Sequence, residues 1–270
     1  MRSLALSLTA LFAFALPLRA ADEAARLGAA LRLPEVAQIL FDEGVRYGKD
    51  IDSDMLGGEG GEHFAGQVAR IYEPQRMTDT MLDQLAQNMN TEQMTRALEF
   101  LDAPLGVRIM QLELTARQAM SDEAVAEFAK EAEAKARAEG VARLDLIDRF
   151  VKVNELIDRN VAGALASNYR FFQGLSAAGP NKMSEGEMMD RVWEQEESIR
   201  ADTLAWMNGY LYMAYGPLTD DELSAYIAFS ETPEGQALNV ALFTGFDAVF
   251  DRIHYDLGQA AARTLASHDL

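Results

Sequence analysis

One phrase occurs twice in the chain, as FLDAPLGVRI at 100–109 and as FSETPEGQAL at 229–238. The shared residues are Phe100, Pro104 and Gly106 in the first copy and Phe229, Pro233 and Gly235 in the second. The residue before a proline avoids the helical region, whereas proline itself fits the first position of a helix. Glycine in that first turn has no Cβ and lets the new helix approach the previous one closely. The phrase therefore predicts a tight corner between two helices.

The residues before the second copy predict where the helices of this corner begin. Thr219 and Glu222 have the spacing of a capping box, in which each side chain bonds the backbone N–H of the other residue. Thr232 stands directly before Pro233 and can cap the helix that Pro233 begins. The first helix of the corner should therefore end near Glu231.

The first copy has a capping box at the same spacing, formed by Asn90 and Gln93. Capping box, phenylalanine, proline and glycine thus recur in register, which is the pattern of an internal repeat. We predict two related helical units, residues 21–140 and 141–270.

The apolar period along the chain is helical, with steps of three and four residues, and no segment requires a strand. We therefore predict an all-α fold of antiparallel helices without a sheet. The expected segments are helices over 75–89, 141–165 and 184–215, a helix capped by Ser121 that ends at Gly140, and breaks at Gly57–Gly61 and Gly174–Pro180.

The N-terminus resembles a secretory signal peptide. Arg2 precedes an apolar run from Leu4 to Leu16, and Ala20 offers a cleavage point, so residues 1–20 are predicted to be removed on export. A retained anchor is the alternative, although the apolar run is short for a bilayer. Cysteine is absent, so there is neither a lipid-bearing cysteine nor a disulfide. These features predict a periplasmic or secreted protein with no stable transmembrane segment after cleavage.

The chain is acidic, with a formal net charge of −19. Such a charge repels nucleic acid and anionic lipid, so we expect no nucleic-acid partner. Residues 201–251 contain eight acids and no lysine or arginine. This window is predicted to be a solvated acidic face.

The second corner resembles a bacterial family called domain of unknown function 2059 (DUF2059). Members look like exported helical proteins with a Thr/Ser-x-x-Glu-Leu start, a central Phe and then Ser/Thr-Pro-x-Gly. The matching residues are Thr219, Glu222, Leu223, Phe229, Thr232, Pro233 and Gly235, within residues 200–250. The first unit is a more divergent copy, with Ala103 in place of Ser or Thr. The resemblance implies a helical fold and export, and it lends no catalytic residues.

No catalytic constellation is found, so we expect no enzyme and no cofactor. The histidines are His63, His254 and His268, and only His254 has an acid one turn away, Asp251, as a weak candidate for a metal or a held imidazole. Asp50, Asp52 and Asp54 suggest a calcium loop but lack the glycine and glutamate an EF-hand requires at positions six and twelve. Whether they bind calcium stays open.

Two other binding features have simpler explanations. Methionines such as Met77, Met81 and Met188 can bind Cu(I), but their helical spacing indicates core packing. A helix that begins at Pro233 can bind an anion, but Glu231 and Glu234 oppose this. We therefore expect no metal site.

Aromatic residues are unevenly distributed, with six in 21–140 and fifteen in 141–270. Trp206, Tyr210, Tyr226 and Phe229 surround the second corner and form either a core or the surface for a ligand or partner. Our leading hypothesis is an exported non-catalytic module that binds or stabilises an envelope protein. The alternative is a carrier of a small apolar ligand in the second unit.

Overall fold

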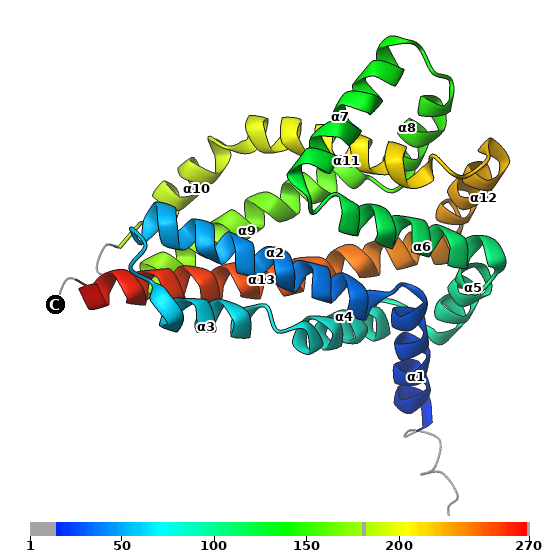
Figure 1. Ribbon diagram of the computed structural model, residues 1–270. Helices are drawn as coiled ribbons and strands as arrows, with labels where there is room; N and C mark the ends of the chain where they lie inside the picture. Colours follow the sequence, from blue (N-terminus) through cyan, green and yellow to red (C-terminus); the bar gives the residue numbers. More distant parts are fainter. Residues whose placement is uncertain (1–14, 180–181, 269–270) are drawn as a thin grey trace, which may run out of the picture.

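The fold is all-α over residues 15–179 and 182–268, which a computed structural model of the chain describes (Figure 1). No strand occurs in these residues, so the predicted fold class is confirmed. The helices are α1 (Ala15–Ala30), α2 (Leu33–Met55), α3 (Gly61–Ile71), α4 (Pro74–Asn88), α5 (Thr91–Leu101), α6 (Pro104–Ala119), α7 (Glu123–Ala138), α8 (Arg143–Val153), α9 (Leu156–Ala178), α10 (Glu185–Trp193), α11 (Glu196–Tyr215), α12 (Asp220–Ser230) and α13 (Pro233–His268).

Both halves of the chain contribute to one hydrophobic core. Leu85 and Met94 of the first half and Ile227 and Leu257 of the second are buried in the same cluster. The long helix α13, orange to red in Figure 1, packs on α9 of its own half and on α3, α4 and α5 of the other half. The segments 21–140 and 141–270 therefore share a core across α13.

The helices of the two halves correspond in length, capping and packing. Helices α2 and α9 both have 23 residues and both follow a left-handed non-glycine residue, Arg32 with φ 59° and Glu155 with φ 52°. Helices α5 and α12 both have 11 residues and a capping box at the N-terminus. Helix α1 packs on α4 and α5, as α8 packs on α11 and α12. These matches support two related units, which stay a prediction.

Both corners have the geometry that the repeated phrase predicts. Helix α12 ends at Ser230, Glu231 is its C-cap residue, and α13 begins at Pro233. The side chain of Thr232 accepts a hydrogen bond from the N–H of Gly235 at 3.0 Å. A Cβ on Gly235 would overlap the carbonyl oxygen of Phe229. In the first copy, a Cβ on Gly106 would likewise overlap the carbonyl oxygen of Phe100, and α6 begins at Pro104.

The two copies of the phrase also contact each other. The rings of Phe100 and Phe229 stack with centroids 4.2 Å apart and planes inclined by 2°. Equivalent residues of the two corners thus meet face to face, and this contact joins α5 to α12. Nothing in the sequence indicated that the repeats would pack on one another.

Two of the expected long helices are broken, so those predictions were wrong. The segment 141–165 forms α8 and α9, because Glu155 takes a left-handed conformation and the buried Asn154 donates its side-chain N–H to the carbonyl of Phe150 at 3.0 Å. The segment 184–215 forms α10 and α11, which meet at Glu194 and Gln195. This break allows both helices to pack on α9, where Asn168 donates to the side chain of Gln195 at 2.7 Å.

Two local predictions also need correction. Asp122 rather than Ser121 caps α7, since its side chain accepts from the N–H of Ala124 at 2.9 Å. Helix α9 continues through Gly174 to Ala178, where a loop was expected. Gly174 faces the backbone of Tyr255 and Gly258 in α13, so its missing side chain serves a close helix crossing instead of a turn.

Most of the predicted signal peptide, residues 1–14, lies outside the described residues. Helix α1 begins at Ala15 and continues past Ala20, the expected cleavage point. Among the described helices, none is sufficiently long and apolar to cross a bilayer.

Most acids of the window 201–251 are exposed, as expected of a solvated face, and several of them form ion pairs. Arginines from outside the window supply the positive charge. The pairs are Arg143 with Asp220 at 2.7 Å, Arg108 with Glu222 at 2.6 Å, Arg149 with Glu231 at 2.7 Å and Arg170 with Asp251 at 2.9 Å. Exposed pairs of this kind contribute little individually, but they connect α6 and α8 to the second corner and α9 to the middle of α13.

The capping box of α12 has a measurable consequence. Thr219→Ala removes the acceptor of the Glu222 N–H and is expected to lower the free energy of unfolding by about 1 kcal/mol in denaturant titrations. Ser224→Ala on the same helix is the control, because Ser224 caps nothing and should change stability by less than about 0.5 kcal/mol. Equal effects of the two substitutions would contradict a role for the box.

Candidate functional site

Two adjoining cavities lie among α9, α11 and α13. The first has a volume of about 270 Å³ and is named the Glu113 cavity here, after the one carboxylate that lines it. The second has a volume of about 440 Å³ and is named the Trp206 cavity. Asn160, Phe243 and Phe246 line both, so the two cavities share a wall. Together they reach the size range of small-molecule sites.

The four aromatic residues singled out in the sequence all line these cavities. Tyr210, Tyr226 and Phe229 face the Glu113 cavity, and Trp206 faces the Trp206 cavity. The rings of Trp206 and Tyr210 stack with centroids 5.2 Å apart, and the guanidinium of Arg117 lies 5.3 Å from the centre of the Trp206 ring. The structure therefore brings the four residues to one place, beside the second corner.

Glu113 on α6 is the residue that sequence reasoning missed. Within QLELTARQ it resembles any glutamate of an amphipathic helix, and no local signal distinguishes it. Its carboxylate accepts a hydrogen bond from the hydroxyl of Tyr215 at 2.8 Å, and its backbone carbonyl accepts one from the hydroxyl of Tyr210 at 3.2 Å. Only the tertiary structure shows that Glu113 faces the aromatic residues of the other half.

Burial raises the pKa of Glu113 from 4.5 to about 7, and hydrogen bonds from Tyr215 and Tyr226 offset only part of this effect. No lysine, arginine or histidine is among the described residues that line the Glu113 cavity. The carboxyl group is thus stabilised by phenols and lacks a cationic neighbour inside the cavity. It changes charge near neutral pH.

One wall of the Glu113 cavity is a cluster of aromatic rings around Tyr226. Its ring lies 4.9 Å from that of Phe150, 5.8 Å from that of Phe100 and 6.0 Å from that of Tyr215, measured between centroids. Phe229 extends the cluster through its stacking on Phe100. The rings that line the cavity come from α8, α11 and α12, and Phe100 of α5 stacks on them without lining the cavity itself.

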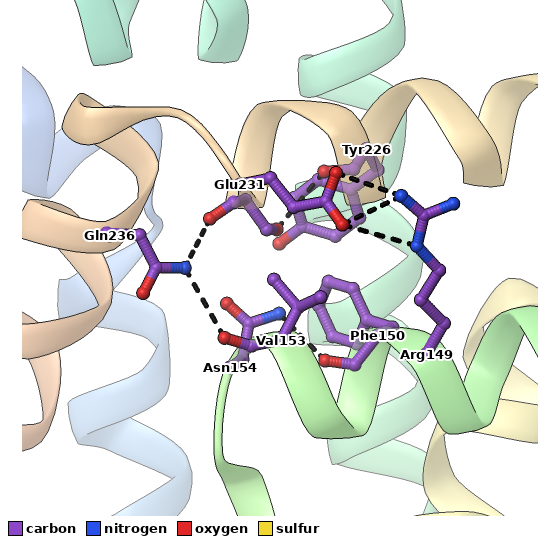
Figure 2. A network of polar contacts seen from close by, with 8 residues as sticks. Arg149, Phe150, Val153, Asn154, Tyr226, Glu231 and Gln236 are labelled. Atoms are coloured by element: carbon purple, nitrogen blue, oxygen red, sulfur yellow. Dashed lines mark hydrogen bonds and ion pairs between the residues drawn. The ribbon is translucent and has the colours of Figure 1, made fainter.

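Beside this wall, a polar network connects the second corner to the end of α8 (Figure 2). Arg149 binds both carboxylate oxygens of Glu231, at 2.7 and 2.9 Å. The side-chain N–H of Gln236 donates to the carbonyls of Ser230 at 2.5 Å and Val153 at 3.3 Å. The second corner and the end of α8 are therefore held together at this edge of the cavity by an ion pair and by hydrogen bonds to backbone carbonyls.

The Trp206 cavity is mostly apolar, as the Glu113 cavity is, but Arg117, Arg159 and Asp247 also line it. Arg117 forms a two-pronged ion pair with Glu43 of α2, with both N–O distances 2.5 Å. Arg159 pairs with Glu155 at 2.8 Å and lies 5.4 Å from the ring of Phe243. The two arginines that line this cavity thus have partners, and they can offer only part of their hydrogen-bonding capacity to a ligand.

His254 lines the Trp206 cavity, and its hydrogen-bond partner is not Asp251, the acid one turn away that the sequence suggested. Its Nδ1 lies 2.9 Å from the carbonyl of Phe250, whereas Asp251 pairs with Arg170 at 2.9 Å. Burial lowers the pKa of His254 below its ordinary value of 6.5, so the imidazole is neutral at pH 7. The pair of His254 and Asp251 is not formed.

The other candidates for metal binding were three aspartates near the end of α2 and two histidines. Asp50, Asp52 and Asp54 lie within α2, and Asp52 accepts a hydrogen bond from the N–H of Gly60 at 2.6 Å. His63 contacts Gln67 at 2.7 Å, and the side chain of His268 lies outside the described residues. Within the described part of the chain, no group of three or more histidines and acids is arranged to hold a metal.

Comparison with known proteins bears on the family. No curated protein and no solved structure matches the chain. A family model described as "Uncharacterized protein conserved in bacteria (DUF2059)" matches residues 75–135. The matching model is that of the predicted family, but it covers only residues 75–135, at the first corner, whereas the resemblance was expected at 200–250. The match includes Phe100, Pro104, Gly106 and Glu113. Residues 75–135 of this chain are thus a DUF2059 segment.

Proposed function

We propose that this chain is a carrier that binds a small, mostly apolar molecule in the Glu113 and Trp206 cavities. The observation that supports this proposal is the pair of adjoining cavities with volumes of about 270 and 440 Å³. Aromatic and aliphatic side chains form most of their walls, and phenols, amides, the carboxyls of Glu113 and Asp247 and the guanidinium groups of Arg117 and Arg159 provide polar contacts. This composition suits a ligand with an apolar body and one polar end.

The alternative that Trp206, Tyr210, Tyr226 and Phe229 merely fill a core is less well supported. A filled core would leave no cavity beside these rings, because protein interiors are packed densely. Here all four border a cavity, and the hydroxyl of Tyr210 bonds the backbone of α6. The aromatic excess of the second half is therefore explained best by a binding site.

In the proposed role the ligand is held and not transformed. The described polar groups that line the Glu113 cavity are phenols, amides, one hydroxyl and one carboxyl, and they include no pair of nucleophile and base. The resemblance of the N-terminal sequence to a signal peptide supports a place of action outside the cytoplasm, in the periplasm or beyond. The carrier would then handle an apolar molecule in an aqueous compartment.

Protein binding or stabilisation, the leading hypothesis from the sequence, stays a prediction. Large exposed side chains that would mark such a surface include Phe128 on α7, 70% exposed, and Trp193 at the end of α10, 61% exposed. They lie on different helices, and single exposed apolar residues are ordinary on protein surfaces. The cavities are the more specific feature.

A neutral fluorescent probe tests the carrier function. N-phenyl-1-naphthylamine should gain fluorescence on binding the wild-type protein. Asn160→Phe places a ring in the wall shared by both cavities and should weaken probe binding by about tenfold or more, a loss of about 1.4 kcal/mol. Asn88→Phe is the matched control, because Asn88 is exposed at the end of α4 and lies outside both cavities.

Circular dichroism should first show that both variants are folded, so that a loss of probe binding can be assigned to the cavity and not to unfolding. Loss of binding in Asn160→Phe with retention in Asn88→Phe supports the cavities as the site. If the probe does not bind the wild type, or if both variants bind it as well as the wild type does, the carrier function is wrong.

A further inference from the structure

The Glu113 cavity contains a carboxyl group that has no positive partner among the described residues that line it. Glu113 faces the cavity, and its carboxyl group accepts hydrogen bonds from the hydroxyls of Tyr215 and Tyr226. An ionised carboxylate in such surroundings is costly unless a cation compensates it. Cavities that bind an apolar molecule alone do not require this charge. The carboxyl group therefore favours a ligand that carries a positive charge.

Charged groups near Glu113 are already paired or lie outside the cavity. On α6, Arg117 lies one turn beyond Glu113 and is paired with Glu43 of α2. On α8, Arg149 is paired with Glu231. The C-cap of α8 contributes the amide of Asn154 to the cavity, α9 that of Asn160 and α13 that of Asn239, and α11 and α12 contribute only tyrosines as titratable groups. No protein cation is thus available to neutralise Glu113 where a ligand would lie.

The walls of the same cavity favour a cation of a particular kind. Seven aromatic side chains line it, among them Phe150, Tyr215 and Tyr226. The faces of aromatic rings attract cations, and aromatic enclosures are the usual sites for quaternary ammonium groups. A small metal ion would need several oxygen or nitrogen ligands, which one carboxylate and apolar walls do not provide. The net charge of −19 attracts cations generally.

We propose that the Glu113 cavity receives the ammonium head of an organic cation whose apolar body extends along the shared wall into the Trp206 cavity. This inference rests on the proposed carrier function and specifies its ligand class. Asn160, Phe243 and Phe246 form the passage that the apolar body would contact. A neutral or anionic molecule with the same apolar body should bind less well.

Binding of a cation must then be coupled to the proton on Glu113. The cation favours the ionised carboxylate, whereas burial holds the pKa of Glu113 at about 7 in the free protein. Below pH 7 the cation therefore displaces a proton, and its affinity rises as the pH is raised toward and through 7. A neutral ligand would show no such dependence.

Three probes with one chain length test the ligand class, namely decyltrimethylammonium, decanol and decanoate, each below its micelle concentration. In calorimetric titrations at pH 8, the ammonium probe should bind about tenfold more tightly than decanol, a difference of about 1.4 kcal/mol. Decanoate should bind most weakly. At pH 5.5 the preference for the ammonium probe should shrink.

Glu113→Gln keeps an acceptor for Tyr215 and removes the charge, so it should abolish the ammonium preference while decanol still binds. Glu131→Gln removes one exposed acid on α7 and is the control for overall charge. A preference that survives Glu113→Gln would overturn the assignment to Glu113. Decanol or decanoate binding as tightly as the ammonium probe would overturn the cation and leave the carrier standing. If no probe binds, the carrier function itself fails.

Discussion

Alanine at Gly235 should lower the free energy of unfolding by about 1–3 kcal/mol, although alanine favours helix more than glycine does. The added Cβ would overlap the carbonyl oxygen of Phe229 and crowd Ser230, both backbone neighbours that cannot move aside as a side chain can. The helices α12 and α13 would have to separate at the corner. Denaturant titration followed by circular dichroism measures the loss.

The chain provides both a matched control and an internal repeat of this experiment. Gly186 lies in α10 with no heavy atom within 4 Å of an added Cβ, so Gly186→Ala should be neutral or stabilising by up to about 1 kcal/mol. Gly106→Ala should cost about as much as Gly235→Ala, because its Cβ meets the equivalent carbonyl of Phe100. If Gly235→Ala is as stable as Gly186→Ala, the corner does not require a close helix contact.

The second large effect is a dependence of stability on pH that originates at Glu113. The pKa of this carboxyl is about 7 in the folded protein against 4.5 ordinarily, so between these values the folded state holds the proton more tightly than the unfolded chain does. The free energy of unfolding contributed by Glu113 is therefore fully present below pH 4.5 and is lost as pH rises to 7. Each pKa unit corresponds to about 1.4 kcal/mol, and partial access of water to the cavity reduces the total to about 2–3 kcal/mol.

Glu113→Gln isolates this contribution from those of the other acids. The variant resembles the protonated carboxyl, so it should match the wild type near pH 4.5 and exceed its unfolding free energy by about 2–3 kcal/mol at pH 8. Glu131→Gln should follow the wild-type profile, since Glu131 is exposed. Parallel profiles of Glu113→Gln and the wild type over pH 4.5–8 would show that the carboxyl is not perturbed in the folded state.

The repeated corner was predictable residue by residue because its causes are local. The box of Thr219 and Glu222, the cap at Thr232 and the helix start at Pro233 depend on the backbone within a few residues. The same holds for the glycine breaks at Gly57–Gly61, where positive φ angles occur. These local preferences do not depend on tertiary packing, so the folded structure retains them.

The broken helices were not predictable from the same signals. An apolar period continues through Asn154 and Glu155, although the chain turns there with Glu155 in a left-handed conformation. What compensates that conformation is the packing of α8 on α12 and of α9 on α13, which periodicity cannot reveal. Gly174 shows the reverse error, because a glycine that suggests a loop is required at a helix crossing.

Only part of the candidate site could be predicted from the sequence, because local features distinguish only some of its residues. The aromatic residues near the second corner stand out by number and size, so Trp206, Tyr210, Tyr226 and Phe229 were visible in the sequence. Glu113 was not, since an acid on a helix is common and its burial depends on α11 and α12, about a hundred residues away. The arginine partners of the acids in 201–251 were hidden in the same way.

The sequence by itself determined the helical class and the two corners, because capping, proline and glycine chemistry and apolar periodicity act over a few residues. Only the tertiary structure decided that Phe100 stacks on Phe229, that both halves share one core, and that Glu113 lies against the tyrosines of the other half. These contacts join residues far apart in the chain. They are fixed by the shape and packing of whole helices, which no local pattern encodes.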